Sequence, residues 1–553
     1  MSQMNLKKTI PTTWMLPAAM LALVMLLPMM AHAAAPGITG PTFNLVAHDS
    51  YLNQPDGSSV YAWGYGCSGT PAGWAPAAIT VHFCNTSQVP GPTLIVTEGQ
   101  KVTVNLTNNL PTAAGNTSIL FPGFQVCTGA LSGTTCTPSS TDGVAGLMTQ
   151  EAAPGGSVTY TFIATTPGTR AYYSGTQSDF QVEMGMYGAI IVLPANVPAV
   201  CTAGLPVTNP GNNAAAKSKW GEADFRLADS AYDHDKTCYD REYLFQFAEM
   251  DGNVHKAALA QINDPVRIAA CAISATTPGC GLEVPTEPFH PNYFVINGRS
   301  MPDDMDPNYA VEYPHQPYNG NPHAHPGEIV LLRVIGQGRW QHPFHEHANH
   351  VRILARDGNL ILSQGNSEDL AGPPLFTTTT TPGLAMDGLF TVTGRGLNWD
   401  MYGHSPTAAN PDSLGNNPDP PCTPDVNGFN TGAPTAINYY EWCADHNKPL
   451  QVAPFGDVAA GGPATLPDPD IFTNGVWYSG SPYLGPDATT RATGPTSSFL
   501  PANAQGNPSN ERGWAFMWHS HNEREITTNN SFPGGMLMML LEDSREFVID
   551  ESN

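Results

Sequence analysis

Histidines are concentrated in two short stretches of this chain. Four of its 17 histidines fall within nine residues of the segment QHPFHEHANH, namely His342, His345, His347 and His350. The segment WHSH adds His519 and His521. Residues two apart on a β-strand project from the same face, so each His-x-His pair can present two imidazoles to one metal ion.

Two such pairs on neighbouring strands would provide four nitrogen ligands, a set that suits copper or zinc. The alternative is that these imidazoles are satisfied polar groups or solvent-exposed side chains that bind no metal. Two pairs, each in strand-like sequence, favour metal binding. An open coordination position would then permit Lewis-acid or one-electron chemistry, whereas a closed set of four would only bind the ion.

Other histidines are weaker candidates. His342 is a fifth candidate ligand, whereas His350 falls off the alternation of the first pair and is expected near the site or on the surface. A third His-x-His, His323 and His325 in NPHAHPGE, lies beside prolines in an expected loop. In that context, two interpretations are equally supported: His323 and His325 are auxiliary metal ligands, or they have no metal role.

The elements around these motifs are expected to be short strands. In residues 101–108, valine and leucine alternate with polar residues, as in a strand with one buried face. Similar runs end in turn signals, and 52 prolines and 54 glycines accompany few long helical patterns. The strand-like runs cover residues 43–48, 155–194, 241–249, 292–298, 328–357 and 513–542. The sequence therefore predicts an all-β chain of tandem Greek-key β-sandwiches.

Composition suggests how these sandwiches divide the chain. We expect one domain over residues 37–200 and a second over 215–402 plus 511–553. Residues 403–510 are dense in proline, glycine, asparagine and aspartate, and contain two cysteines. This stretch is expected to be a loop-rich insert held by a disulfide.

Residues 1–33 have the pattern of a secretory signal peptide. Lys7 and Lys8 precede an apolar stretch over residues 14–30, and the small-residue triplet 31–33 follows it. A membrane anchor is the alternative, but the apolar stretch is short and two prolines interrupt it. No later segment has the roughly 20 consecutive apolar residues of a spanning helix. An exported protein without a membrane span, periplasmic or extracellular, is therefore expected.

The ten cysteines form an even set, which predicts disulfides in an exported chain. Pairing of nearest neighbours would close five loops, although spacing alone leaves the connectivity open. The cysteines are Cys67, Cys84, Cys127, Cys136, Cys201, Cys238, Cys271, Cys280, Cys422 and Cys443.

The charge balance argues against nucleic acid as a partner. The chain has 22 basic and 47 acidic residues, for a formal net charge of -25, so a polyanion would be repelled. Metal cations would instead be concentrated near the surface. Solubility in the exported compartment is the better explanation for most of these charges.

The two histidine motifs resemble the copper-binding signatures of the multicopper oxidases. HPFHEH, followed by ARDG, resembles the family's His-Pro-x-His-x-His run. By this resemblance, His342 corresponds to a ligand of the mononuclear type 1 copper, and His345 and His347 to ligands of the trinuclear cluster. WHSH, followed by GGM, resembles the His-Cys-His run, in which the histidines at positions 519 and 521 also belong to the trinuclear cluster.

The chain departs from the family at the remaining type 1 ligands. Ser520 replaces the cysteine, and Glu525 occupies the spacing of the second type 1 histidine. Met536 matches the axial methionine after a short insertion. A serine hydroxyl is a hard and weak ligand compared with a thiolate, so a type 1 centre is not expected.

The N-terminal domain resembles the family in its framework but has lost its ligands. Leu120 and Pro122 stand where the family has one His-x-His, and Tyr173 and Gly175 stand where it has another. The run MGMYGAIIV, residues 184–192, still matches the family. The resemblance covers residues 37–400 and 511–545, and it implies cupredoxin-like domains.

Four of the eight trinuclear histidines are retained, so this resemblance does not imply conventional four-electron reduction of oxygen within one chain. Two-domain relatives form trimers with clusters between subunits, so a homotrimer is the implied oligomer, although an identical partner also lacks the N-terminal histidines. The first hypothesis is a divergent copper-dependent oxidoreductase acting on a small molecule or a metal ion. The alternatives are a non-catalytic protein that binds or sequesters copper and a structural pseudo-oxidase of the cell exterior.

Overall fold

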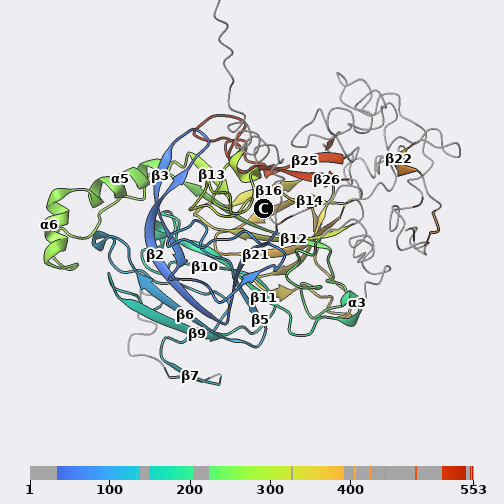
Figure 1. Ribbon diagram of the computed structural model, residues 1–553, viewed down its shortest axis with the longest axis horizontal. Coiled ribbons are helices and arrows are strands. Elements are labelled where there is room, and N and C mark those ends of the chain that lie inside the picture. The colour runs from blue at the N-terminus through green and yellow to red at the C-terminus, as the bar shows by residue number, and fades with distance from the viewer. Residues whose placement is uncertain are drawn as a thin grey trace, which may run out of the picture.

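The computed structural model describes residues 34–133, 135–137, 149–202, 223–325, 328–391 and 513–543, with isolated residues between 404 and 551. The predicted signal peptide and most of the predicted insert lie outside the described residues. The described part is mostly strand and contains four sheets of four or more strands (Figure 1). This confirms the predicted all-β class, while the exact domain boundaries stay predictions.

Two sheets enclose the N-terminal core. One has the order β10-β11-β5-β1-β4 and the other β3-β2-β6-β9. Their strands are β1 (Gly37–Thr39), β2 (Thr42–Asn53), β3 (Ser59–Cys67), β4 (Trp74–Ala75), β5 (Leu94–Thr97), β6 (Lys101–Asn108), β9 (Ser157–Ile163), β10 (Gly168–Tyr173) and β11 (Tyr187–Leu193). In β6, Val102, Val104 and Leu106 are fully buried, so the predicted alternation is confirmed.

Two further sheets form the C-terminal sandwich. The first has the order β13-β12-β15-β21-β17-β18, with β19 beside β17. Its strands are β12 (Arg241–Met250), β13 (Tyr293–Ile296), β15 (Ile329–Gly336), β17 (Val351–Arg356), β18 (Asn359–Leu360), β19 (Pro374–Leu375) and β21 (Ala385–Thr391). The second has the order β14-β26-β25-β16-β20, with β24 beside β25. Its strands are β14 (His323–Ala324), β16 (His342–Glu346), β20 (Thr377–Thr380), β24 (Gly480–Pro482), β25 (Gly513–Ser520) and β26 (Leu537–Asp543).

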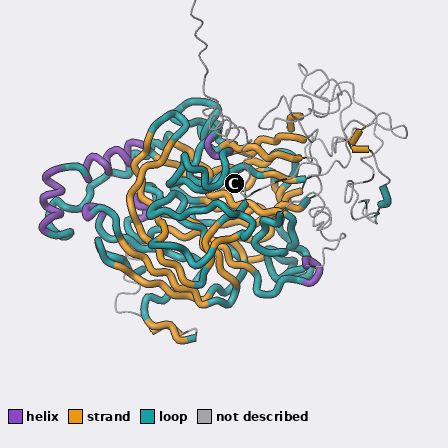
Figure 2. The backbone as a smooth tube through the Cα atoms, in the orientation of Figure 1, coloured by secondary structure: helices purple, strands orange, loops and turns teal. Residues whose placement is uncertain are grey.

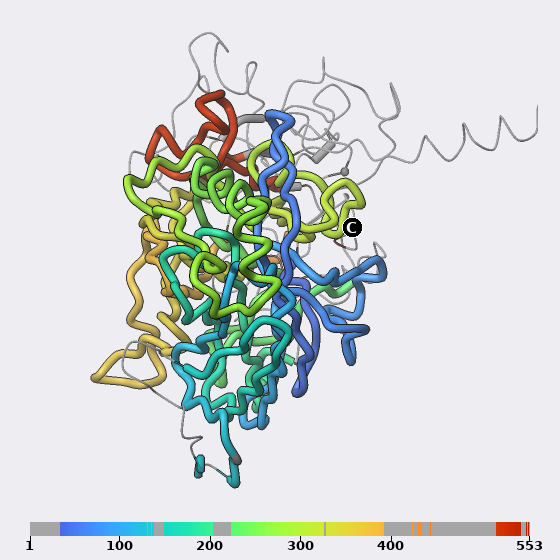
Figure 3. Tube along the Cα trace, turned by 90° about the vertical axis from the view of Figure 1, so that its left-hand side faces the viewer, coloured from blue at the N-terminus to red at the C-terminus, as the bar shows by residue number. Residues whose placement is uncertain are grey.

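The hairpin of β25 and β26 completes the second C-terminal sheet, as the sequence predicted. It returns from far along the chain to pair with β16 and β14, and in Figure 3 it appears as the red segment beside the green and yellow part of the chain. Trp518 anchors it from the inner face. The indole is fully buried against Phe344 and Phe390, and its Nε1 donates to the carbonyl of His347.

Alternation along these strands separates an inner from an outer face. Phe344, Phe516, Trp518, Met538 and Leu540 belong to one buried core between the two C-terminal sheets. The intervening residues of β16, β25 and β26 therefore project from the opposite, outer face of the sheet. Both His-x-His pairs lie among these intervening positions.

Two helices form an arm that the sequence analysis did not predict. α5 (Gly252–Ile262) and α6 (Pro265–Ile273) follow β12 and lie at one edge of the molecule (Figure 2). Asp251 and Asp264 cap them by accepting hydrogen bonds from the backbone N–H two residues on. These caps, and Pro265 in the first turn of α6, were the available sequence signals.

The other short elements lie in connections. They are η2 (Thr112–Ala114), β7 (Ala130–Ser132), β8 (Thr135–Thr137), α2 (Ser178–Gln181), α3 (Ala199–Thr202), η3 (Asp303–Met305), β22 (His404–Ser405) and β23 (Asn417–Pro418).

A buried polar network joins the two sandwiches. Asp387 accepts hydrogen bonds from Thr169 of β10 and from the Tyr232 hydroxyl. Arg333 of β15 donates to Glu242 at 2.8 Å and to the Thr169 hydroxyl at 3.0 Å. Because these groups are buried and mutually satisfied, they fix how the N-terminal sandwich sits against the C-terminal one.

All ten cysteines are paired with their nearest neighbours in sequence, which confirms the predicted framework. The bonds are Cys67–Cys84, Cys127–Cys136, Cys201–Cys238, Cys271–Cys280 and Cys422–Cys443. Five disulfides indicate an oxidising compartment. Across the described ranges, every helix is too short or too polar to cross a membrane.

The Trp518→Ala substitution should lower the free energy of unfolding by about 3–5 kcal/mol, because it leaves a cavity in the core and removes a buried hydrogen bond. Urea denaturation followed by circular dichroism measures this change. Val311→Ala is the control, since Val311 is 80% exposed and its truncation should have little effect. Equal effects of the two substitutions would show that the indole does not anchor the hairpin.

Candidate metal centre

Strand pairing brings the two His-x-His pairs together. β16 and β25 are antiparallel neighbours, and their register sets His345 directly opposite His519. The ring centroid of His345 lies 4.8 Å from the ring centroids of His347 and His521, and 5.5 Å from that of His519. The centroid of His519 lies 5.2 Å from that of His347 and 5.5 Å from that of His521. Four imidazoles therefore form one group on the outer face of the sheet.

One nitrogen pair already has the spacing of metal ligands. Nε2 of His519 lies 3.2 Å from Nε2 of His347. Two nitrogens on one tetrahedral ion lie about 3.3 Å apart when each metal–nitrogen bond is about 2.0 Å long. Across the ranges that the structure describes, no set of three or more histidine, cysteine, aspartate or glutamate side chains is arranged so that it could hold a metal ion.

Hydrogen bonds orient two of the rings. Nδ1 of His519 lies 2.8 Å from the carbonyl oxygen of Ser520, so this nitrogen carries the proton and Nε2 holds the lone pair that faces the group. Nδ1 of His345 lies 2.6 Å from the hydroxyl of Thr377 on β20. Metal-binding histidines commonly use their second nitrogen in this way, because the hydrogen bond fixes the ring orientation.

Burial keeps two rings of the group neutral. Burial, together with the neighbouring imidazoles of His519 and His521, lowers the pKa of His345 to about 4. Burial also lowers the pKa of His519. Since only a neutral imidazole can bind a metal, these rings are in the binding form at neutral pH.

One side of the group is open to solvent. His345, His347 and His519 are buried, whereas the side chain of His521 is 54% exposed. Phe376, which is 45% exposed, packs edge-on against His345. A small molecule or a hydrated ion can therefore approach along the side of His521.

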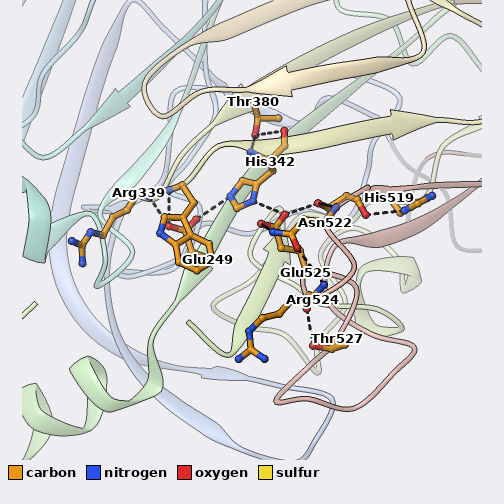
Figure 4. A network of polar contacts seen from close by, with 11 residues as sticks. Glu249, Arg339, His342, Thr380, His519, Asn522, Arg524, Glu525 and Thr527 are labelled. Atoms are coloured by element: carbon orange, nitrogen blue, oxygen red, sulfur yellow. Dashed lines mark hydrogen bonds and ion pairs between the residues drawn. The ribbon is translucent and has the colours of Figure 1, made fainter. Parts of the chain in front are cut away.

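His342 does not join this group. It lies three residues before His345, on the inner face of β16, and both of its ring nitrogens contact carboxylates. Nε2 lies 2.9 Å from Glu249 and Nδ1 lies 2.9 Å from Glu525 (Figure 4). His342 is therefore not a fifth member of the group, as the sequence had predicted it to be. His342 and His345 are three residues apart, so their side chains project from opposite faces of the strand.

The positions matched to a type 1 centre do meet, but as a hydrogen-bonded network. The Ser520 hydroxyl and His342 Nδ1 both donate to Oε2 of Glu525, and the Asn522 amide donates to Oε1. Met536 is fully buried beside them, and its backbone pairs with those of Ser520 and Glu525. The inner face thus carries a completed polar cluster.

Glu249 closes the other end of this network. It accepts hydrogen bonds from the backbone N–H groups of Arg339 and Trp340 as well as from His342. Burial lowers the pKa of His342, but the hydrogen bonds to Glu249 and Glu525 outweigh burial and raise the pKa to about 9. His342 is therefore an imidazolium at neutral pH, held between two carboxylates.

Two glutamates in this region were missed by the sequence analysis. Glu249 ends the apolar run of β12, and a carboxylate in a buried strand was the signal that could have revealed it. Glu346 lies between His345 and His347 but points inward, where it accepts a hydrogen bond from Thr378. Burial raises the pKa of Glu346 to about 8, so this residue is protonated at neutral pH.

In the N-terminal domain, residues without metal-binding groups occupy the positions that the resemblance matched to histidines. Leu120 and Tyr173 pair through their backbones, so the two segments that lack histidines are neighbours. A Cβ atom at Gly175 would lie 2.9 Å from Leu120 Cγ, which shows how tightly this leucine packs. These positions offer no nitrogen or sulfur donor to a metal.

The remaining histidines lie apart from the group. His323 and His325 are buried, and β14 is separated from β25 by β26. The Tyr243 hydroxyl contacts the backbone of His323, and the N–H of His325 donates to Glu328. His350 is half-buried with its ring against Phe376. The structure does not add these three to the four-histidine group.

Comparisons with known proteins point to one family. Residues 78–197 match the family model described as multicopper oxidase. Laccase abr2 from Aspergillus fumigatus is 34% identical over 127 residues, which is 23% of this chain and 19% of that protein. Multicopper oxidase MCE from Talaromyces pinophilus is 37% identical over 112 residues, which is 20% of this chain and 16% of that protein. The matches thus span less than a fifth of these relatives.

Solved structures of the same kind are also similar. A multicopper oxidase, mgLAC, matches with 15% identity and a TM-score of 0.42, covering 91% of this chain and 85% of that one. A blue copper oxidase from Nitrosomonas europaea matches with 16% identity and a TM-score of 0.42, covering 90% of this chain and 85% of that one.

The charged state of His342 makes stability depend on pH. Its pKa is about 9 in the folded chain and near 6.5 when unfolded, so its contribution is complete below pH 6.5 and is lost as the pH rises through 9. The loss should be roughly 3 kcal/mol. Urea unfolding between pH 6 and 10 measures it, and His342→Gln should remove this part of the dependence. An unchanged pH profile in that variant would contradict the assignment.

Proposed function

We propose that the chain is a distant member of the multicopper oxidase family, and that it is an exported oxidoreductase that binds one copper ion through His345, His347, His519 and His521. The observation that carries this proposal is the β16–β25 register, which sets His345 opposite His519 and leaves the Nε2 atoms of His347 and His519 3.2 Å apart. Four imidazoles are a donor set that suits copper, with zinc as the alternative.

The residues of the group have distinct roles in this proposal. His347 and His519 form the preformed half of the site, and the bond from His519 to the Ser520 carbonyl holds its ring in place. His345, kept neutral by burial, supplies a third nitrogen. His521 lies at the exposed edge, where a small molecule or a metal-ion substrate would approach. Bound copper would supply one-electron or Lewis-acid chemistry at this position.

The inner network argues against a second, thiolate-bound copper. Ser520 has no sulfur and its hydroxyl already donates to Glu525, while His342 is protonated between two carboxylates. An imidazolium has no lone pair for a metal. Any oxidation of a substrate would therefore occur at the outer histidine group itself.

Copper sequestration is the second candidate function. It is favoured by the serine at position 520, since a chain without the thiolate site lacks the usual entry point for electrons. A set of four histidines that closes around the ion would bind copper without an open position for a substrate. The two functions share the site and differ in turnover.

Purified protein should bind about one Cu(II) per chain and give the electron paramagnetic resonance spectrum of nitrogen-ligated type 2 copper. His345→Ala and His519→Ala should each weaken binding by more than the roughly 10–100-fold typical of losing an outer-shell partner. His350→Ala is the matched control, because its ring lies outside the group. Binding that is unchanged in both alanine variants would sink the proposed site and favour a structural pseudo-oxidase.

Turnover separates the two candidate functions. Oxidation of phenols or of metal ions should be detectable with copper-loaded protein, should depend on added copper, and should be abolished by His519→Ala. Oxygen consumption and product absorbance measure the rate. The His342→Gln variant should keep the activity, since that residue lies on the inner face. Stoichiometric copper uptake without any turnover would establish sequestration instead.

A further inference from the structure

Two methionines lie beside the four-histidine group on the same face of the sheet. Met517 of β25 and Met539 of β26 are directly opposite each other in the antiparallel register. On the other side of Met517, its carbonyl accepts a hydrogen bond from the backbone N–H of His347. His347, Met517 and Met539 therefore form one row across three neighbouring chain segments.

Packing does not account for these two thioethers. Their sequence neighbours Phe516, Trp518, Met538 and Leu540 fill the core on the inner face. Met517 is 41% exposed, and Met539 is only partly buried. Met517, which is exposed, and Met539, which is partly buried, thus present two thioethers in register on the outer face of the sheet, where they are available as ligands.

The geometry suits a soft cation. Side chains directly opposite on antiparallel strands have Cβ atoms roughly 4.5–5.5 Å apart, and the three rotatable bonds of methionine let both sulfur atoms turn toward one ion. Thioethers select Cu(I) over harder ions, whereas imidazoles accept copper more generally. The acidic chain, with a net charge of -25, also attracts cations.

We propose that Met517 and Met539 form a soft-donor site for Cu(I) next to the histidine group, with His347 bordering both. This inference rests on the proposed function. It adds that copper first binds as Cu(I), and that it does so at the two methionines. His347 is the side chain shared by the row of sulfur donors and the group of nitrogen donors. Copper held by the methionines would thus lie beside its final ligands.

The test uses Ag(I), a redox-inert analogue of Cu(I), in chloride-free buffer, and then Cu(I) in anaerobic competition with a chromogenic chelator. Met517→Leu with Met539→Leu keeps the side-chain volume and removes both sulfurs. The doubly substituted chain should bind one Ag(I) fewer than the wild type, or bind it at least tenfold more weakly. Met538→Leu, one residue away and inside the core, is the control and should bind as the wild type does.

Labelled methionine methyl groups provide a second measurement. The two resonances that disappear in the doubly substituted chain should be the ones that shift when Ag(I) is added to the wild type. Equal Ag(I) binding by the wild type and the double variant, or no shift of these two resonances, would overturn the inference and leave an exposed methionine pair without a ligand.

Cu(II) binding, measured on the same samples, keeps the two proposals apart. The double leucine variant should bind Cu(II) at the histidines as the wild type does. If no form of the protein bound Cu(II) while Ag(I) still bound at the methionines, only the histidine centre would be rejected. If Cu(II) still bound and the two leucine substitutions left Ag(I) binding unchanged, only the methionine site would be rejected.

Discussion

The antiparallel pairing of β16 with β25 is the constraint on which the candidate site depends. Its register sets His345 opposite His519, and alternation then assigns every neighbouring residue to a face. A shift by one residue would turn Trp518 outward and the histidines into the core. The buried indole of Trp518 and its hydrogen bond to the His347 carbonyl therefore select the register and, with it, the imidazole group.

The same strands carry opposite chemistry on their two faces. The outer face has imidazoles and thioethers, which are donors for a soft or borderline metal. The inner face has a protonated imidazole, two carboxylates and a hydroxyl that satisfy one another. A buried ion pair that loses one partner leaves an uncompensated charge, so the network is maintained as a unit. It occupies the positions matched to a type 1 copper and makes a metal there unnecessary for folding.

The N-terminal sandwich contributes framework instead of ligands. Leu120 packs against Gly175 where the related family has histidines, and the surrounding strands are retained. Its attachment to the C-terminal sandwich is polar and buried, through Arg333, Thr169 and Asp387. The domain therefore attaches to the C-terminal sheet that contains β15 and β21, whereas the histidines lie on the other C-terminal sheet and all come from the C-terminal half.

The sequence alone determined most of the strands, the presence of an even set of cysteines and the two His-x-His motifs, because alternation and spacing are local properties. The connectivity of the cysteines was left open by the sequence and was decided by the structure. The resemblance of the sequence to the multicopper oxidases also predicted that Ser520 and Glu525 stand at the positions of metal ligands. Only the tertiary structure decided that His342 faces away from the other histidines, that Glu249 meets it from a distant strand, and that Met517 and Met539 stand side by side. These relations depend on strand register and on which face of a sheet is buried, and both are set by packing between segments far apart in the chain.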